Sequence, residues 1–542
     1  MKKLTAILLA LTLALSLFSG CNSVTAPTTD NPGTGNVVNA PPVDVDASSQ
    51  IAWEDSYVKV AIDLDPGTFG PFETNNNGRR QTLPEVFECL AQYQGHGGEV
   101  KGVLAKDWYA VDGEENTYII ELYDYIYDSI GNHLTADDII FSFEAGLKAF
   151  KRYLGCIETI EAVNDYTLKL KLNSSDVGTL EHILCMCWVC DQDSYEASAD
   201  GMAYEPVGTG PYKVVNAVEG SKVVMEARDD YWQTDESLRV NNQFQNAKTI
   251  EFIVVTESSQ KAILLETGEV DVVSGMSYEQ ASQFMNNENY NVIVDTDNKA
   301  RTLVFNCNEA SVCSNLALRQ AILYAIDSEG LLAGFDNAGE VAYAIGNSTY
   351  PDIYAAWDDG NYYAFDQAKA KELLKEAGYE KGVKVRLLTD TSEMNGKIAN
   401  ILEGYLSQIG IDLEIMQFEE TLAKTYMRDF TFFDIYLVYN GTPDYAITMW
   451  NERLTNETYD NGLNYCGIND ETLQEMLVKT RDVANYSEET MTELNDYISD
   501  HAYIYALFSP YVYTVSNKNM TDVCLTAEMW MVPGCNTYVW NK

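Results

Sequence analysis

A repeated order of helix, glycine and strand constrains the fold of this chain more than any other feature of its sequence. Residues 366–377 are predicted as a helix that begins at an aspartate cap and ends at Gly378, and residues 383–387 then alternate as in a strand. The same order follows once more, with a helix over 398–409 and an alternating segment over 411–415. Helices and strands that alternate in this way are typical of α/β packing.

The rest of the chain carries the same mixture of signals. Thr135 is predicted to cap a helix that runs to about residue 147, because Asp137 and Asp138 fall in its first turn and apolar residues then mark one face. Further predictions are strands over 57–64 and 167–172, a polar loop over 73–80, a helical stretch over 83–93, and a helix over 316–327.

Length and charge narrow the class of protein. At 542 residues the chain exceeds what one hydrophobic core usually organises, so two or more lobes are expected. An apolar fraction of 46% with 11% aromatic residues excludes a disordered chain. The formal net charge of −47 repels nucleic acid and anionic lipid headgroups, so a nucleic-acid partner is excluded, and neutral or cationic small ligands remain compatible.

The first 21 residues have the layout of a secretory signal. Lys2 and Lys3 precede an apolar run over 4–18, which is too short to span a bilayer, and Ser19-Gly20-Cys21 supplies the small residues of a cleavage site. This ending resembles the lipobox of bacterial lipoproteins, although Phe18 stands where that family prefers leucine. The resemblance implies lipidation of Cys21 and a lipid anchor on the outer face of the bacterial cytoplasmic membrane. The alternative is an ordinary signal followed by a chance cysteine.

A tether follows the signal. Residues 22–50 are rich in Thr, Pro, Asn, Gly, Val and Asp and show no helical or strand period. By random-coil scaling such a segment reaches on the order of 30 Å, so a folded body is expected to stand clear of the membrane surface.

Ten cysteines remain after Cys21. Outside the membrane disulfides are permitted, and Cys307 with Cys313 would close a short loop; the alternative is buried thiols. Cys185, Cys187 and Cys190 lack the paired spacing of structural zinc sites, which favours a buried, partly disulfide-linked segment over a metal site.

Catalytic motifs are not found. The four histidines form no HExxH pattern, no GxSxG elbow or P-loop occurs, and we expect no cofactor. Gly208-Thr209-Gly210 is followed by a proline and is interpreted as a tight turn. Pairs of carboxylates are not evidence for a glycoside hydrolase here, because a chain with 82 acidic residues always contains such pairs.

An ordered set of phrases covers the chain from about residue 55 to its C-terminus. It comprises Leu104-Ala105-Lys106-Asp107-Trp108, Thr117-Tyr118, Leu134 to Ser142, Pro206-Val207-Gly208-Thr209-Gly210-Pro211-Tyr212, Gly268-Glu269-Val270-Asp271, Phe305-Asn306, Leu318 to Asp327, and Ala370 to Tyr379. The set resembles the bacterial extracellular solute-binding proteins of the oligopeptide and dipeptide type, family 5, which are the binding lipoproteins of ABC importers. One departure is the looser turn Asp128 to Leu134, where the family has "DGTPL".

The resemblance implies an α/β fold, a two-lobed periplasmic-binding-protein-like clamp of type II with mixed sheets and a hinge of two crossing segments. Lobe one is expected over 51–297 plus 505–542, and lobe two over 298–504. Ligand would be trapped between the lobes on closure, and the closed monomer would dock on a membrane permease.

The resemblance also implies ligand-binding positions. In peptide-binding relatives an aspartate of lobe two pairs with the ligand's amine; here Asp444 lies in the corresponding loop, and Tyr439 or Asn440 stands near the place of the family's tryptophan. In lobe one, Asn75 and Arg79 lie where relatives contact ligand. We add Trp450 as a stacking candidate. Each candidate also has a simpler interpretation. The polar residues could be exposed loop residues, and the tryptophan could be a core residue.

Two classes of function follow. The first is a binding protein that delivers oligopeptides to an importer, with an oligosaccharide or another small solute as alternative cargo, or a receptor for signalling peptides. The second is a cell-surface glycoside hydrolase, which would turn its ligand over rather than return it intact.

Overall fold

The computed structural model describes residues 52–73, 77–93, 100–149, 152–240, 243–296, 299–342, 350–354, 362–441, 445–456, 464–521 and 539–540. All of them belong to one compact unit, residues 35–542. The predicted signal sequence with Cys21, the predicted tether, and the candidate ligand residues Asn75 and Asp444 lie outside the described residues.

A large mixed sheet organises the described part of the chain. Its twelve strands are β1 (Tyr57–Ile62), β8 (Tyr212–Val218), β9 (Lys222–Ala227), β10 (Thr249–Val254), β11 (Val272–Met276), β12 (Tyr290–Thr296), β13 (Lys299–Phe305), β14 (Gly339–Val341), β15 (Val383–Asp390), β16 (Ile411–Phe418), β17 (Ile435–Gly441) and β18 (Ile504–Asn517). The path is β16-β15-β17-β13-β18-β11-β1-β10-β9-β8, and β12 and β14 also pair with β18. Pairing is parallel around β1 and around β15 and antiparallel elsewhere, which gives the predicted α/β mixture.

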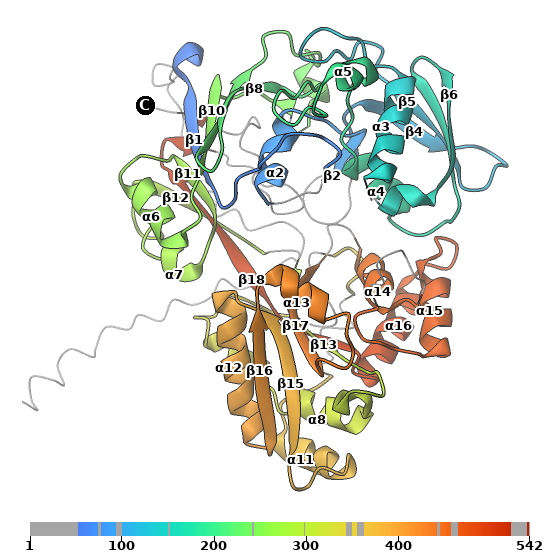
Figure 1. The fold of residues 1–542 in the computed structure, drawn as a ribbon, viewed down its shortest axis with the longest axis vertical. Helices are drawn as coiled ribbons and strands as arrows, with labels where there is room; N and C mark the ends of the chain where they lie inside the picture. The colour runs from blue at the N-terminus through green and yellow to red at the C-terminus, as the bar shows by residue number, and fades with distance from the viewer. Residues whose placement is uncertain are drawn as a thin grey trace, which may run out of the picture. The chain divides into compact units, whose positions relative to one another are not determined.

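Strand β18 joins the two halves of this sheet. Its first half pairs with β13 and β14, and its second half pairs with β11 and β12. Figure 1 shows it running between the group that contains β1 and β10 and the group that contains β15 and β16. The predicted boundary between the lobes falls in the connection from β12 to β13.

A second sheet belongs to the N-terminal half. It has four antiparallel strands in the order β4 (Ala105–Ala110), β5 (Thr117–Leu122), β7 (Thr167–Leu172) and β6 (Ile157–Asn164). Two short pairs complete the strands: β2 (Ala91–Tyr93) with β3 (Val100–Gly102), and β19 (Met520–Thr521) with β20 (Val539–Trp540).

Helices cover both groups of strands (Figure 1). In the first half they are α2 (Asn77–Thr82), α3 (Ala136–Lys148), α4 (Thr179–Met186), α5 (Gln192–Ala197), α6 (Ser258–Glu266) and α7 (Tyr278–Ala281). In the second they are α8 (Leu316–Tyr324), α9 (Ser328–Ala333), α11 (Gln367–Glu376), α12 (Glu393–Ser407), α13 (Glu420–Tyr426), α14 (Ala446–Leu454), α15 (Glu471–Arg481) and α16 (Glu488–Asp500).

The hydrophobic cores follow the same division. Three clusters draw almost entirely on residues 58–284, with a few residues of β18 and its continuation, and two other clusters draw on residues 303–508. Each half therefore buries its own apolar side chains, as independent lobes would.

One segment crosses between the halves. Residues 175–177 run antiparallel to residues 481–483: the Val177 amide donates to the Arg481 carbonyl at 2.8 Å, and the Val483 amide donates to the Ser175 carbonyl at 2.9 Å. Arg481 also forms an ion pair with Asp176 at 3.4 Å, and Val177 packs against the core of the second half.

Local signals predicted several of these elements correctly. Helix α3 starts after Thr135, where the Asp138 carboxylate accepts from the Thr135 amide at 2.7 Å. Helix α11 is capped by Asp366, and Gly378 after it has φ = +87°, as a helix-ending glycine requires.

Two predictions near the start of the chain were wrong. The stretch 83–93 is not a helix: a short 3-10 turn over Leu83–Glu85 is followed by strand β2, because β3 offers a partner for its backbone. The stretch 73–80, predicted as a loop, instead contains the start of α2.

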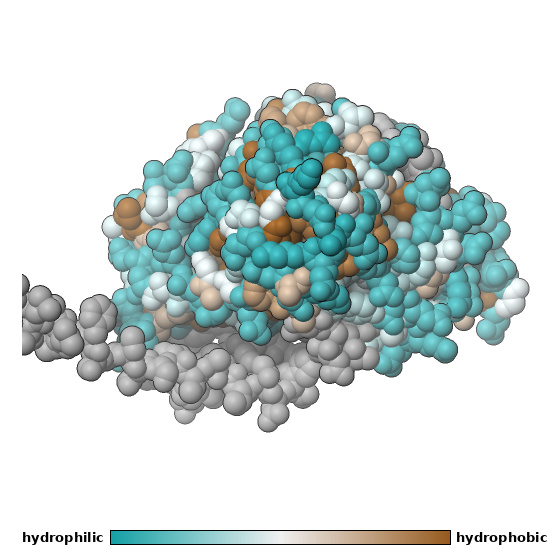
Figure 2. All heavy atoms as spheres, turned by 90° about the horizontal axis from the view of Figure 1, so that it is seen from below, coloured by the Kyte–Doolittle hydropathy of each residue, from teal (hydrophilic) through white to brown (hydrophobic). Residues whose placement is uncertain are grey.

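The surface is consistent with the composition. Figure 2, seen from below, shows a face on which hydrophilic residues predominate and hydrophobic groups are small and separate. None of the helices in the described part of the chain has the length and apolarity needed to cross a bilayer.

Candidate functional site

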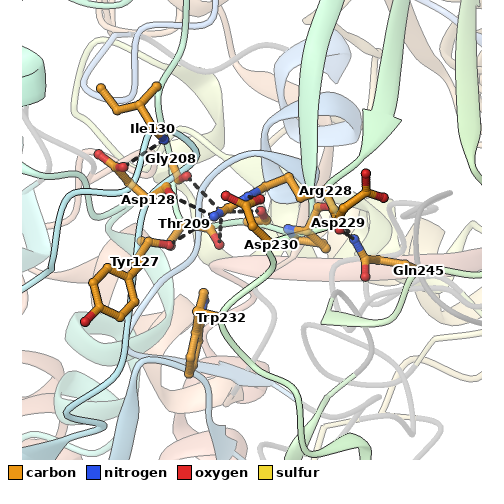
Figure 3. Close-up of polar contacts among 12 residues, drawn as sticks. Tyr127, Asp128, Ile130, Gly208, Thr209, Arg228, Asp229, Asp230, Trp232 and Gln245 are labelled. Carbon is orange, nitrogen blue, oxygen red and sulfur yellow. Dashed lines mark hydrogen bonds and ion pairs between the residues drawn. The ribbon is translucent and has the colours of Figure 1, made fainter.

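The Gly-Thr-Gly turn of the first half is wrapped around one arginine (Figure 3). The buried Arg228 donates through Nη1 to the carbonyls of Thr209 at 3.0 Å and Gly210 at 3.1 Å, and through Nη2 to the carbonyl of Asp128 at 2.7 Å. A Cβ atom on Gly208 would lie 2.1 Å from the carbonyl oxygen of Val86, so only glycine fits this close approach. The predicted tight turn is therefore a junction that joins three segments.

Asp128 extends this junction to α5. Its carboxylate accepts from the amides of Ile130 and Asn132, both at 2.9 Å, and from the Ser194 hydroxyl at 3.0 Å. Ser194 also has its amide bonded to the Asp191 cap, so the start of α5 is fixed in two directions. The neighbouring residue Tyr195 thereby takes a defined position.

A buried carboxyl group lies beside the same junction. Glu88 is 3% exposed and accepts from the Tyr231 hydroxyl at 2.7 Å, the Trp232 indole at 2.8 Å and the Gln243 amide at 2.9 Å. Burial raises the pKa of Glu88 above its usual value, although these hydrogen bonds oppose the shift. The group is fully engaged by the protein and is interpreted as structural.

Arg79, a predicted ligand contact, lies on α2 and is directed into the protein. Its side chain is 2% exposed, and Nη1 donates to the carbonyl of Thr68 at 2.6 Å and to the hydroxyl of the same residue at 2.7 Å. Nη2 donates to the Gly70 carbonyl, and the side chain forms an ion pair with Glu73 at 3.7 Å. In this conformation Arg79 holds the segment 68–73 in shape and does not face solvent.

That segment forms one wall of a pocket of about 440 Å³. The other walls come from α3, α5 and the turn after α5, and the lining residues are Phe72, Glu73, Phe141, Ala145, Lys148, Ala149, Tyr195, Asp200 and Gly201. Its volume lies within the usual range for small-ligand sites, and its walls combine apolar and polar surface in comparable amounts.

Three aromatic rings organise this pocket. The Phe72 ring lies edge-on to Phe141, with centroids 6.1 Å apart, and to Tyr195 at 5.2 Å, while Phe141 and Tyr195 are 5.5 Å apart. These are favourable geometries for aromatic pairs, so the three rings hold one another. Burial, with contributions from Cys190 and Glu73, raises the pKa of Tyr195, which keeps its hydroxyl neutral.

A second polar cluster lies at one edge of the large sheet in the second half. Strands β15 and β17 are parallel and end at this edge, and β13 begins there because Lys299 is paired with Gly441. In α/β sheets, ligands bind outside the carboxyl ends of such strands.

Tyr439, a predicted ligand residue, lies in this cluster beneath two cations. The guanidinium carbon of Arg301 is 3.9 Å from the centre of the Tyr439 ring, and the Lys299 ammonium is 5.6 Å from it. Arg301 also donates to the Asn395 side chain at 2.9 Å, and Asn395 donates to the Asp390 carboxylate at 3.0 Å. The cluster places positive charge at the sheet edge of a strongly acidic chain.

The remaining candidates are placed as follows. Trp450, on α14, is fully buried among the apolar residues of the second half, so in this conformation it has no surface with which to stack on a solute. Asn440 is a residue of β17, paired with Ala300. The structure thus brings Tyr439 together with Arg301 and pairs Arg79 with Glu73, a residue of the pocket wall.

Several residues of these sites were missed in the sequence. Phe72, Phe141 and Tyr195 come from three separate segments, and nothing in their spacing indicates that they converge. Arg301 lies outside every helix and strand that the sequence predicts, and no motif marks it.

The cysteines give no metal site. Among the described residues no group of His, Cys, Asp or Glu side chains is arranged to hold a metal ion. Cys307 and Cys313 are thiols, so the proposed disulfide between them is not formed, and burial raises the pKa of Cys307 to about 11. Cys190 is likewise a buried thiol, and not part of a disulfide.

Comparisons with known proteins agree with this architecture. The family model of bacterial extracellular solute-binding proteins, family 5 (middle), matches residues 99–462. The glutathione-binding protein GsiB of Salmonella paratyphi A is 27% identical over 379 residues, which are 66% of this chain and 69% of that protein.

Solved structures extend the likeness to the whole fold. NikA from Brucella suis, in complex with Fe(III)-EDTA, has a TM-score of 0.77 at 20% identity and covers 89% of this chain and 100% of its own. The oligopeptide-binding protein AppA from Bacillus subtilis, in complex with a nonapeptide, has a TM-score of 0.72 at 18% identity, covering 88% and 97%. The predicted two-lobed α/β clamp is confirmed at the level of the fold.

Proposed function

Because this chain belongs to the bacterial extracellular solute-binding proteins of family 5, whose members serve ABC transporters, we propose that it is a lipoprotein that captures oligopeptides between its lobes and delivers them to a membrane permease. The proteins it resembles are solute-binding proteins and not enzymes. The proposal concerns the cargo, the lipid anchor on Cys21 and the use of an interlobe cleft.

The positively charged sheet edge carries the proposal for a peptide. A peptide presents a terminal carboxylate, and Arg301 with Lys299 supplies cations held over an aromatic ring. Away from bulk water, charge-assisted bonds between a carboxylate and a guanidinium are strong and directional. AppA, a similar fold, has been solved with a nonapeptide.

A second candidate cargo is a different carboxylate-bearing solute. The same cations suit any carboxylate, and the structure of NikA contains Fe(III)-EDTA. Sequence features weaken an amine-pairing role for Asp444, since the tryptophan expected near it is replaced. An oligosaccharide, which has no carboxylate in its simple forms, fits the cations less well.

Native mass spectrometry of residues 23–542, purified without refolding, tests the cargo. We expect a ladder of added masses that, after denaturation, is identified as peptides. A single non-peptide solute would refute the peptide proposal and leave the importer role in place. Hydrolysis of an added peptide or oligosaccharide by the purified protein would contradict the binding role itself.

The anchor is tested separately in the full-length chain. Expressed in a bacterium, the protein should partition into the detergent phase of a Triton X-114 separation, and the Cys21→Ser variant should move to the aqueous phase. Equal partition of the two proteins would refute lipidation at Cys21.

A further inference from the structure

Three thiols of the second half gather near the end of β13. Cys313 and Cys466 are fully buried, and Cys307, which follows β13, is half-buried. Cys307 packs against both hydrophobic clusters of this half, one of which contains Cys313 and the other Cys466. Either of the other thiols is therefore a candidate partner for Cys307.

The backbone places Cys307 beside Cys466. The Cys307 amide donates to the Cys466 carbonyl at 2.7 Å. A backbone bond of this length holds two Cα atoms about 5–6 Å apart, within the range of about 4.4–6.8 Å that a disulfide spans. The two residues are far apart in the sequence, so this contact is a result of the fold and not of local spacing.

The two sulfur atoms lie on either side of one backbone contact. The Cys307 thiol donates to the Phe305 carbonyl at 3.5 Å, and the Cys466 thiol donates to the Tyr503 carbonyl at 3.4 Å. The Phe305 amide donates to the Tyr503 carbonyl at 3.0 Å, so the groups that hold the two sulfur atoms are themselves bonded. Thiols are weak donors, and turning either sulfur about its Cα–Cβ bond therefore gives up little.

Cys313 is the competing partner, and the geometry favours it less. It lies in a 3-10 turn, Val312–Ser314, whose cap Ser311 accepts from the Cys313 amide at 3.0 Å. The Arg319 guanidinium donates to the Cys313 carbonyl at 2.7 Å, which holds the turn from a second side. Among the described residues no backbone bond joins Cys313 to Cys307, and a link between them would close only a short loop.

We propose that Cys307 and Cys466, thiols in the structure, are a disulfide-forming pair that closes a covalent loop around most of the second half. The chain belongs to a family of extracellular proteins, and disulfides persist outside the cytoplasm. In this step each thiol loses its proton, and the two sulfur atoms together lose two electrons as the S–S bond forms. The electrons cleave the disulfide of the oxidant, a small disulfide or a thiol–disulfide oxidoreductase, into two thiols that take up the protons.

Burial determines when the bond forms. It raises the pKa of Cys307 to about 11 and the pKa of Cys466 well above the usual value for a thiol. The thiolate is the reactive form, so at pH 7 the folded protein contains little of it and exchanges slowly with an external disulfide. The bond is therefore made while the second half folds, and burial then protects it from reduction.

Peptide mapping of exported protein tests the pair. The full-length chain is expressed in a bacterium that has a thiol–disulfide oxidoreductase outside its cytoplasm, denatured in N-ethylmaleimide without reductant, and cut after lysine and arginine. Cys307 then lies in peptide 302–319 and Cys466 in peptide 454–479. We expect these peptides as one linked species. A further cut after Glu309 separates Cys307 from Cys313 and should leave the link on Cys307.

Thermal unfolding measures what the link does. A disulfide that closes a long loop restricts the unfolded chain, so the oxidised protein should unfold at least about 5 °C above the same protein refolded in dithiothreitol. Cys466→Ala should remove this difference between oxidised and reduced protein. Cys313→Ala is the matched control, because it deletes another buried thiol of the same half and should keep the difference.

The contrary outcomes are distinct. N-ethylmaleimide on both Cys307 and Cys466, or a link from Cys307 to Cys313 or to a thiol of the first half, would overturn the pair. A linked pair whose unfolding temperature does not change on reduction would overturn the stabilising loop. The mapping uses the unaltered chain, so it decides between these outcomes even if a variant does not fold.

Discussion

Removal of the Arg228 guanidinium should destabilise the first half of the protein severely. Its side chain is 1% exposed, and it donates to carbonyl oxygens of two separate segments, 127–128 and 208–210. Arg228→Met keeps most of the aliphatic length and removes all the donors. The carbonyl groups would then be left in a buried place without these partners.

The structure sets the size of the effect. Three of the five carbonyl bonds are 3.1 Å or shorter, and hydrogen bonds to charged groups contribute about 1.5–3 kcal/mol each. The contributions are not additive, because the carbonyls share one donor group and some gain water on relaxation. A loss of about 3–5 kcal/mol in the free energy of unfolding is the expected result.

Urea unfolding followed by tyrosine and tryptophan fluorescence measures this loss, with a check that two probes give one transition. Arg239→Met is the control, since Arg239 is only half-buried and donates to a single carbonyl, that of Gln233 at 2.7 Å. It should lose less than about 1.5 kcal/mol. An equal, small loss in both variants would refute the role of the carbonyl cage in holding the turn.

Three further changes have defined outcomes. Burial alone would raise the pKa of Asp434, but hydrogen bonds donated by Arg386 outweigh burial and lower that pKa. The stability lost in Asp434→Asn should therefore be full at pH 7 and should shrink as the pH falls below about 4, which urea unfolding at each pH would measure. Gly208→Ala should lose more than about 3 kcal/mol in thermal unfolding, because its Cβ would collide with the Val86 carbonyl. Arg481→Ala breaks the ion pair to Asp176, and hydrogen exchange at residues 175–177 should become roughly tenfold faster.

Each of these has a control and a contrary result. Gly404→Ala adds a methyl group to a helix position with open space and should be neutral or stabilising, so equal damage at both glycines would contradict the packing argument. A pH-independent loss in Asp434→Asn would show that its charge is not what stabilises the fold. Unchanged exchange in Arg481→Ala would show that the backbone bonds hold the crossing segment alone.

Sequence signals within a few residues predicted individual helices and strands, whereas the candidate sites depend on packing between residues far apart in the sequence. Thr135 and Gly378 carry their signals within a few residues, and the helices they bound were predicted correctly. The stretch from Leu83 to Tyr93 contains a strand because β3 pairs with it, and the local apolar pattern does not indicate that partner. Arg79 looked like a solvent-facing cation in a polar loop, but the carbonyls of Thr68 and Gly70 give it more bonds than a surface position would.

The pocket illustrates the same limit. Its rings come from residues 72, 141 and 195, and bonds between distant segments bring them together: the Gln192 amide donates to the Asp138 carboxylate at 2.8 Å, and the Phe69 amide donates to the Ala203 carbonyl at 2.8 Å. No feature local to any one of them indicates a shared wall.

The shared strand β18 has a consequence for how the chain folds. It pairs with strands of both halves, yet it lies more than 400 residues after β1. Contacts between residues so distant in sequence are slow to form, because the entropy of closing the intervening loop is lost before they stabilise anything. Each half can collapse on its own core early, but β11 and β13 must keep an open edge until residues 504–517 arrive. We therefore expect a late docking step in folding, in which this one segment joins the strands of both halves.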